Sequence, residues 1–232
     1  MNTGWYKPFA FSTYFMVRGP GDFPNWPEPS PVPAKSFVGR LRKRLGLDAL
    51  YLPTEAQWEY ACRAGPTTAL NNGTDLTDIH SCTNLDQLGF YIGNMKKITS
   101  GICNDANVGS FQPNAWGLYD MHGNAFEWCL DLPRIYNSYP IQDPIGLESN
   151  CSIGGLRRGG STLSPAKDCR SAARDKVEIL FRQVPSGFRL VTWPPKIHIP
   201  IRSIEEKKKH NSQIRAKSDL AQFAVSFSKI QE

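Results

Sequence analysis

Apolar residues recur at helical spacing between residues 34 and 45. Most lysines and arginines of this stretch lie away from the apolar face. Gly46 follows directly, and glycine ends helices readily because it adopts left-handed conformations at little steric cost. The pattern therefore predicts an amphipathic helix that ends at Gly46. Its apolar face consists of Phe37, Val38, Leu41 and Leu45.

A second helical pattern follows Thr54. Thr54 is a favoured N-cap residue, and Gln57 three positions later completes a capping box. Trp58, Ala61 and Cys62 share one face, and Gly65 ends the pattern. Because so short a helix is marginal on propensity alone, we expect the packing of Trp58 to stabilise it.

Regular structure is expected to be sparse elsewhere. The 232 residues include 19 glycines and 18 prolines, which favours a loop-rich α+β fold over a helical bundle. Residues 66–107 are polar and rich in turn residues, so we expect loops with short strands there. Alternation over residues 186–193 predicts a final core strand. We expect an N-terminal segment (1–21), one domain (22–195) and a tail (196–232).

The positive charge of the chain is concentrated in the tail. The formal net charge is +6, and residues 196–232 hold eight Lys/Arg against four Asp/Glu, which is +4. The domain is therefore close to neutral, and we expect no nucleic-acid partner and a solvated, disordered tail. No apolar run reaches the length of a membrane span, and no leader is visible. We therefore expect a cytoplasmic monomer without a membrane partner.

Cysteines and histidines form no metal-ligand spacing. The six cysteines contain no Cys-x-x-Cys pair, which argues against a zinc knuckle or a thioredoxin-type site. Without a secretory signal we expect most of them to be reduced and buried. The four histidines are scattered, and we expect surface or packing roles for them. The cysteines are Cys62, Cys82, Cys103, Cys129, Cys151 and Cys169; the histidines are His80, His122, His198 and His210.

Two carboxylates lie in an aromatic, glycine-containing loop over residues 114–131. Asp120 and Glu127 are seven positions apart, and Gly117 and Gly123 permit an irregular backbone between the aromatic residues. Carboxylates and backbone carbonyls are the oxygen ligands that Ca²⁺ prefers. Two interpretations are open: a calcium loop, or a solvated acidic turn in which Glu127 caps a helix or pairs with an arginine.

Four sequence pieces stand in an order that closely resembles the formylglycine-generating enzyme family, also called sulfatase-modifying factors. They are Leu52–Ala61, Pro113–Trp128, Arg158–Ser161 and Gly187–Leu190. The resemblance implies a fold with little regular secondary structure, related to the C-type lectin fold. It also implies a protein or peptide substrate, because the founding activity oxidises a sulfatase cysteine to formylglycine with O₂ and copper held by two cysteines.

The resemblance also implies site residues. Calcium would be bound by the side chains of Asp120 and Glu127 and the carbonyls of Gly123 and Ala125, and Ser161 matches an active-site position. The usual opening strand of the family is not visible, so we expect a core strand to be missing from the N-terminus.

The segment after Ser161 departs from the family pattern. Active oxidases carry two cysteines there, whereas this chain has only Cys169, and Phe126 replaces an active-site tryptophan. One thiol does not provide the two thiolates that suit Cu(I). Cys169 is either a lone reactive thiol, activated by a neighbouring arginine, or a buried cysteine. The whole domain is either an enzyme of the sulfatase-modifying group or a non-catalytic, calcium-stabilised, lectin-like binding module.

Overall fold

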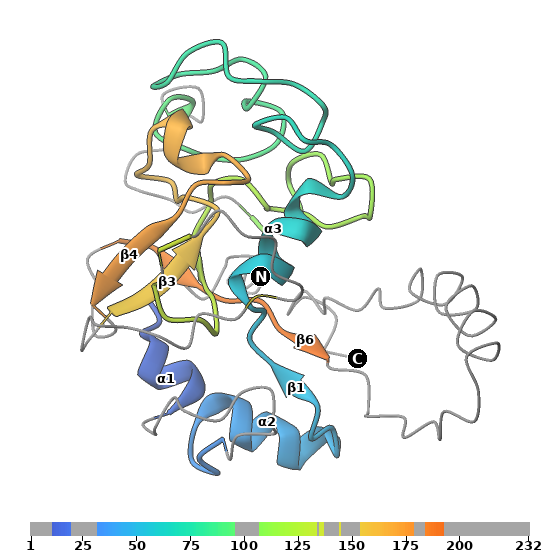
Figure 1. Ribbon diagram of the computed structural model, residues 1–232, viewed down its shortest axis with the longest axis vertical. Helices are drawn as coiled ribbons and strands as arrows, with labels where there is room; N and C mark the ends of the chain where they lie inside the picture. Colours follow the sequence, from blue (N-terminus) through green and yellow to red (C-terminus); the bar gives the residue numbers. More distant parts are fainter. Residues whose placement is uncertain are drawn as a thin grey trace, which may run out of the picture.

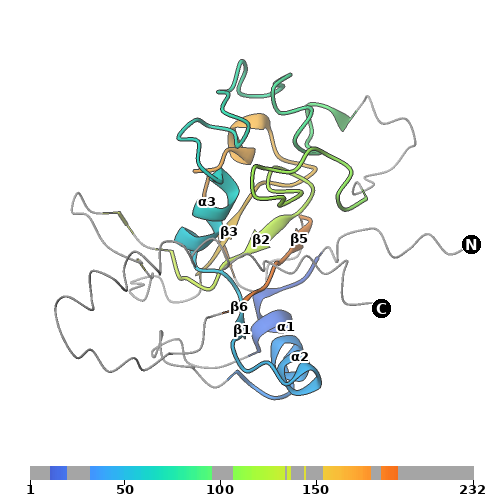
Figure 2. The same ribbon diagram turned by 90° about the vertical axis from the view of Figure 1, so that its right-hand side faces the viewer.

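The structure is a computed structural model, and it describes residues 11–19, 32–95, 107–133, 135–136, 144, 154–178 and 184–192. Within these ranges the helices are short and the loops extensive (Figures 1 and 2). The predicted mixture of helices and strands with little regular structure is confirmed. The helical elements are α1 (Tyr14–Arg18), α2 (Phe37–Leu45), α3 (Glu55–Arg63) and the 3₁₀ turn η3 (Ala166–Cys169).

The strands form two small sheets. The larger has the order β4-β3-β2-β5, with β2–β3 and β3–β4 antiparallel and β2–β5 parallel. The smaller pairs β1 with β6 antiparallel. The strands are β1 (Leu50–Tyr51), β2 (Phe126–Trp128), β3 (Gly154–Arg158), β4 (Asp175–Glu178), β5 (Ser186–Gly187) and β6 (Val191–Thr192).

Helix α3 begins as the sequence predicts. The Thr54 hydroxyl accepts from the Gln57 N–H, and the Gln57 side chain accepts from the Thr54 N–H, which completes the capping box. Trp58 and Cys62 are buried, as expected, whereas Ala61 is only half-buried. The left-handed residue at the end is Ala64, one position before the predicted glycine.

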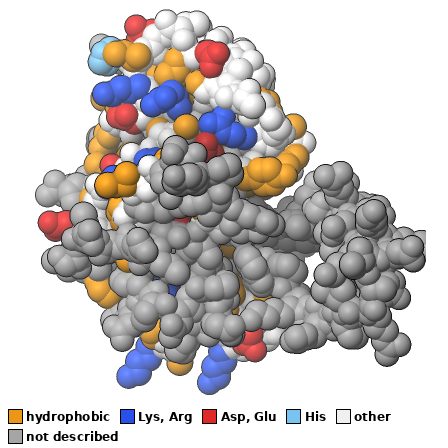
Figure 3. Space-filling view, viewed as in Figure 1, with side chains coloured by type: hydrophobic (Ala, Val, Ile, Leu, Met, Phe, Trp, Pro, Cys, Tyr) orange, Lys and Arg blue, Asp and Glu red, His pale blue; other side chains and the backbone are white. Residues whose placement is uncertain are grey.

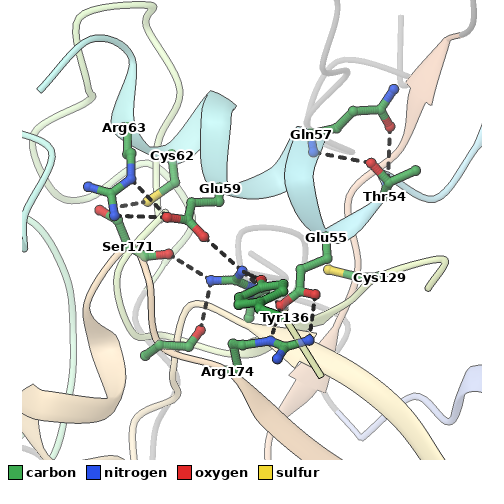
Figure 4. A network of polar contacts seen from close by, with 12 residues as sticks. Thr54, Glu55, Gln57, Glu59, Cys62, Arg63, Cys129, Tyr136, Ser171 and Arg174 are labelled. Carbon is green, nitrogen blue, oxygen red and sulfur yellow. Dashed lines mark hydrogen bonds and ion pairs between the residues drawn. The ribbon is translucent and has the colours of Figure 1, made fainter. Parts of the chain in front are cut away.

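Charged side chains hold α3 against β3 (Figure 4). Glu55 is buried on the first turn of α3, where it pairs with Arg158 of β3 and with Arg174. Arg158 also pairs with Glu59 at 2.8 Å and donates to the carbonyl oxygen of Ser171. Buried charges persist where they are paired and hydrogen-bonded, so this cluster fixes how α3 sits on the sheet.

Helix α2 lies at one end of the described molecule, beside α1 and β1 (Figures 1 and 2). Val38 and Leu41 are buried, and Gly46 is left-handed with φ of 66°, as the pattern predicts. The prediction for Leu45 was wrong, because this side chain is exposed. Leu45 is the last residue of the helix, and the groups that cover Val38 and Leu41 do not cover it.

The predicted strand over residues 186–193 is two separate strands. β5 pairs with β2 of the large sheet, and β6 pairs with β1 of the small sheet. The chain leaves the large sheet at Phe188, after β5, and the Arg189 side chain pairs with Glu127. Short strands were also expected in residues 66–107. The described part of this range, 66–95 and residue 107, contains turns and no strand.

Residues 11–19 pack against the main core. The indole N–H of Trp128 donates to the Ser12 carbonyl at 2.9 Å, and the Tyr14 ring packs edge-on against Trp128 with centroids 5.9 Å apart. Tyr14 and Val17 join a cluster with Leu50, Leu52 and Leu190. Among the described residues, no helix is both long and apolar enough to span a bilayer.

Candidate functional site

Asn114 fixes the start of the acidic loop to the end of α3. Its side-chain oxygen accepts from the N–H groups of Trp116 and Leu118, each at 3.0 Å. Its side-chain nitrogen donates to the carbonyls of Ala61, at 2.7 Å, and Cys62. One buried amide thus satisfies four backbone groups and positions the loop that carries Asp120.

Asp120 carries a buried oxygen without a partner. Its backbone is left-handed, with φ of 57°, which is uncommon outside glycine. Oδ2 accepts from the Gly109 N–H at 2.8 Å, whereas Oδ1 is buried and has no hydrogen-bond partner in the described structure. Burial raises the pKa of Asp120, and the Gly109 N–H and the Arg189 charge only partly offset this effect.

Glu127 pairs with an arginine. The Arg189 guanidinium contacts both carboxylate oxygens, through Nε to Oε2 and through Nη2 to Oε1, the latter at 2.6 Å. The Trp58 indole N–H also donates to Oε2, at 2.6 Å. The two charged side chains are 12 % and 10 % exposed, so solvent screens this pair little. Burial alone would lower the pKa of Arg189, but the charge and hydrogen bonds of Glu127, together with the charge of Asp120, outweigh it and raise that pKa.

Arg189 and Trp58 leave some of the carboxylate oxygen sites of this loop without a hydrogen-bond partner. A carboxylate has about four lone-pair sites, and Arg189 and Trp58 occupy three of those on Glu127. One site on Oε1 remains, and Asp120 Oδ1 is unpartnered. Calcium takes carboxylate and carbonyl oxygens of this kind. The pairing of Glu127 with an arginine, which the sequence left open as an alternative, is therefore present. It leaves one site on Glu127 Oε1 and the Asp120 Oδ1 atom without a hydrogen-bond partner.

The backbone of the loop lies close to its neighbours at Gly123. A Cβ atom there would stand 2.2 Å from the Phe90 carbonyl oxygen, and φ is 76°. The Gly123 N–H donates to the Gly159 carbonyl at 2.7 Å, and the Thr162 N–H donates to the Asn124 carbonyl at 3.0 Å. These bonds join the acidic loop to the segment around Ser161, so the two predicted parts of the site are neighbours.

Ser161 lies in a closed, fully buried turn. Its hydroxyl is 3.2 Å from the Ser164 hydroxyl and accepts weakly from the Leu163 N–H. Its own N–H donates to the Ser164 hydroxyl at 2.9 Å. In this arrangement the Ser161 hydroxyl faces other protein groups and is not presented to solvent.

The described cysteines are buried thiols. Cys62, Cys82, Cys129 and Cys169 are all free and buried, as the sequence predicts, while Cys103 and Cys151 lie outside the described residues. Burial raises the pKa of Cys169, and the neighbouring charge of Asp168 adds to this. Of the two alternatives for Cys169, the structure supports the buried cysteine and not the thiol activated by an arginine, because Arg170 donates to the Lys167 carbonyl and Arg174 pairs with Glu55.

Copper does not fit the described residues after Ser161. Cys169 is the single thiol of that segment, and its sulfur packs 2.5 Å from where a Cβ of Gly160 would stand. Within the described ranges no three His, Cys, Asp or Glu side chains gather in a way that suits a metal ion. A calcium loop would use only two carboxylates together with backbone carbonyls, so the absence of three clustered side chains from the described residues does not bear on it.

The described histidines have the packing and surface roles expected. His80 is exposed. His122 is fully buried; its Nδ1 lies 2.7 Å from the Cys169 carbonyl, and its Nε2 accepts from the Asn71 N–H. Desolvation lowers the pKa of His122 to about 4, so the ring is neutral at pH 7. His198 and His210 lie outside the described residues.

Two further polar side chains at this site were not predicted from the sequence. Asn124 and Thr162 are buried. Neither Oδ1 of Asn124 nor Oγ1 of Thr162 has a hydrogen-bond partner in the described structure. Asn124 also has φ of 63°. Asn is enriched among non-glycine residues at positive φ, so the Gly123-Asn124 pair was a usable signal for a special turn.

Comparisons with known proteins agree with the four motifs. Residues 28–193 match the family described as the sulfatase-modifying factor enzyme 1-like domain. The formylglycine-generating enzyme of Bos taurus is 33 % identical over 136 residues, which are 54 % of this chain and 34 % of that protein. The enzyme of the same name from Streptomyces coelicolor is 37 % identical over 131 residues, covering 53 % of this chain and 40 % of that protein.

A solved structure shows the same fold. PvdO from Pseudomonas aeruginosa matches with a TM-score of 0.58 and 24 % identity, covering 82 % of this chain and 63 % of that one. The chain spans only about a third to two fifths of the length of the two curated relatives. The family match covers well over half of this chain, and the chain therefore belongs to the sulfatase-modifying factor family.

Proposed function

We propose that this chain recognises a cysteine-containing polypeptide, the substrate class of the formylglycine-generating enzymes that it resembles. The family match over residues 28–193 carries the proposal. Its support in the fold is that the acidic loop and the Ser161 turn are joined through Thr162 and Asn124. A relation to the C-type lectin fold belongs to the same proposal.

The oxidation step is not assigned to the described residues. Copper, where it is bound in this family, would supply the reaction with O₂, and it needs thiolates that can reach it. Cys169 is buried with a raised pKa, and Ser161 and Phe126 carry no soft ligand. In the proposal, this chain's residues hold the acidic loop and the Ser161 turn in place, and Ser161, whose hydroxyl is buried, marks the position that matches the family's active site.

A second candidate is the non-catalytic, calcium-stabilised binding module. The burial of Cys62, Cys129 and Cys169 favours it, because burial raises the pKa of these thiols and so lowers the thiolate population that oxidation requires. The two candidates share peptide recognition and differ in turnover. Mass spectrometry of a peptide with the sulfatase-type Cys-x-Pro-x-Arg motif, after incubation with the protein, Cu(I) and O₂, distinguishes them. A mass change from thiol to aldehyde supports the enzyme, and bound but unchanged peptide supports the module.

Calcium is part of both candidates, held by Asp120, Glu127 and the carbonyls of Gly123 and Ala125. A ligand that binds only the folded state raises its stability, by about 2.7 kcal/mol at a hundred times its Kd. Calcium should therefore raise the melting temperature of the parent chain. The increase should disappear in Asp120→Ala and persist in Asp168→Ala, which removes an exposed carboxylate elsewhere. An unchanged melting temperature of the parent would remove calcium from the proposal.

A further inference from the structure

Two aromatic side chains are exposed together where α3 meets the acidic loop. Tyr60 on α3 is 69 % exposed, and Trp116 in the loop is 37 % exposed. Their ring centroids lie 5.0 Å apart, and the ring planes meet at 69°. Figure 3 shows hydrophobic side chains at the surface on the flank where Figure 1 draws this loop beside α3. We call the pair Tyr60 and Trp116 the aromatic corner.

The aromatic corner is held in place by the groups beneath it. The Trp116 backbone N–H donates to the side-chain oxygen of Asn114 at 3.0 Å. The Asn114 side-chain nitrogen donates in turn to the carbonyl of Ala61, the residue after Tyr60, at 2.7 Å. Because these bonds join the loop to the helix before any partner binds, the entropy cost of binding is small. Rigid Trp and Tyr side chains are also the residues that most often dominate the energy of an interface.

The groups around the aromatic corner suit an uncharged, extended chain. Glu59 and Arg63, beside Tyr60 on α3, pair with each other at 2.8 Å, so they leave no net charge for a polyanion or a polycation. In the described structure the indole N–H of Trp116 has no hydrogen-bond partner and can donate to a ligand. A polyproline II segment offers matching groups, because its rings are apolar and its carbonyls make no internal hydrogen bonds. Aromatic surfaces bind PxxP segments in this way.

The chain itself contains such a segment. Residues 24–33 include five prolines, and residues 24–27 read Pro-Asn-Trp-Pro, which is a PxxP sequence. Polyproline II has three residues per turn, so the two prolines of this motif would share one face. Residues 20–31 lie outside the described part of the chain. The described residues on either side meet beside α1 and α2, where a Cβ on Gly19 would stand 3.0 Å from Pro33.

We propose that the proline-rich segment (residues 24–33) of one copy of this chain docks on the aromatic corner of a second copy. The corner is open to a second copy, because both of its rings are exposed in the structure of the single chain. Two copies that exchange segments make two identical contacts, which is the closed symmetry of a dimer. The proposal replaces the monomer expected from the sequence, and it is independent of the peptide recognition proposed above.

Sedimentation velocity of the full chain tests this association. We expect a monomer–dimer equilibrium with a Kd below about 100 μM. Tyr60→Ala/Trp116→Ala should raise the Kd of the dimer at least about thirtyfold, the size of effect found for central aromatic residues of interfaces. Ile79→Ala/Ile92→Ala is the matched control: it removes two exposed apolar side chains elsewhere and should dimerise as the parent does. Melting curves verify that each variant is folded.

A mixing experiment tests whether the segment is the occupant. Pro24→Ala/Pro27→Ala should weaken self-association as strongly as Tyr60→Ala/Trp116→Ala does. An equimolar mixture of these two variants should form heterodimers, because each pair retains one intact segment and one intact corner that fit together. A mixture that stays monomeric, a parent that is monomeric, or equal Kd values for the corner variant and its control would overturn the proposal.

A labelled peptide distinguishes a second copy from other occupants. A fluorescein-labelled peptide of residues 22–33 should bind Pro24→Ala/Pro27→Ala, whose corner is free, and should bind Tyr60→Ala/Trp116→Ala at least about thirtyfold more weakly in fluorescence anisotropy. If the peptide binds the corner but the parent remains a monomer at every concentration, the occupant is the chain's own segment or another protein, and the proposal is wrong.

Discussion

Replacing Arg189 with methionine removes the cation that neutralises the Glu127 carboxylate. Glu127 then keeps the Trp58 N–H and loses both guanidinium contacts, while its side chain is only 12 % exposed. Breaking a buried pair by removing one partner costs about 3–5 kcal/mol, because the remaining charge is left uncompensated. Two lost hydrogen bonds to a charged group, at about 1.5–3 kcal/mol each, give a similar figure.

Urea unfolding followed by tryptophan fluorescence measures this loss as a change in the free energy of unfolding. A loss of about 4 kcal/mol corresponds to a melting temperature lower by roughly 8–16 °C in a chain of this size. Arg170→Met is the matched control: Arg170 is exposed and donates to one carbonyl, so its change should stay within about 0.5 kcal/mol.

A double-mutant cycle separates the pair from other effects of the methionine side chain. Glu127→Gln in the Arg189→Met background removes the uncompensated charge, so the double variant should be more stable than Arg189→Met alone. If Arg189→Met costs less than about 1 kcal/mol, or if Glu127→Gln does not restore stability, Glu127 is not held by this arginine in the folded protein.

Three further predictions follow from packing and burial. Trp58→Ala should lower the free energy of unfolding by about 3–5 kcal/mol, measured by urea denaturation, because Trp58 fills the core beneath α3; a near-neutral effect would contradict that. Gly123→Ala should cost about 2–4 kcal/mol, since its Cβ would meet the Phe90 carbonyl at positive φ. Gly73→Ala, at positive φ in open space, should cost about 1 kcal/mol. Equal losses of stability in the two glycine variants would contradict the close contact at Gly123. His122 has a folded-state pKa of about 4, below its unfolded value, so its stabilisation is complete above about pH 6.5 and is lost as the pH falls toward 4. Between about pH 6.5 and about pH 4 the protonation of His122 should lower the free energy of unfolding by about 3 kcal/mol, and His122→Gln should make stability less dependent on pH. Parallel plots of stability against pH for the parent and the variant would contradict a lowered pKa of His122.

Local signals in the sequence predicted local features well. The capping box of Thr54 and Gln57 lies within one helical turn, and the positive φ of Gly46 and Gly123 follows from the steric freedom of glycine. The burial of Trp58 follows from helical periodicity. These features depend on neighbours a few residues away, which the sequence displays directly.

Long-range pairings were harder to predict. The partner of Glu127 is 62 residues away, and Ser12 bonds to the carbonyl of Ser186 across 174 residues. The alternation over residues 186–193 did not reveal that Arg189 leaves one sheet to reach Glu127. Glu55 lies in the first turn of α3, where the helix dipole favours a negative charge, but its burial between two arginines depends on where β3 packs. Composition showed the charges but not the elements that bring them together.

Peptide binding by the full chain tests the central proposal most directly. Fluorescence anisotropy would follow a labelled peptide with the Cys-x-Pro-x-Arg motif, and the same peptide with alanine for cysteine, during titration with the protein. The account predicts saturable binding of the cysteine peptide with a Kd below about 1 mM, and weaker binding of the alanine peptide. Absence of binding to either peptide, by a protein shown to be folded, would contradict recognition of a cysteine-containing polypeptide.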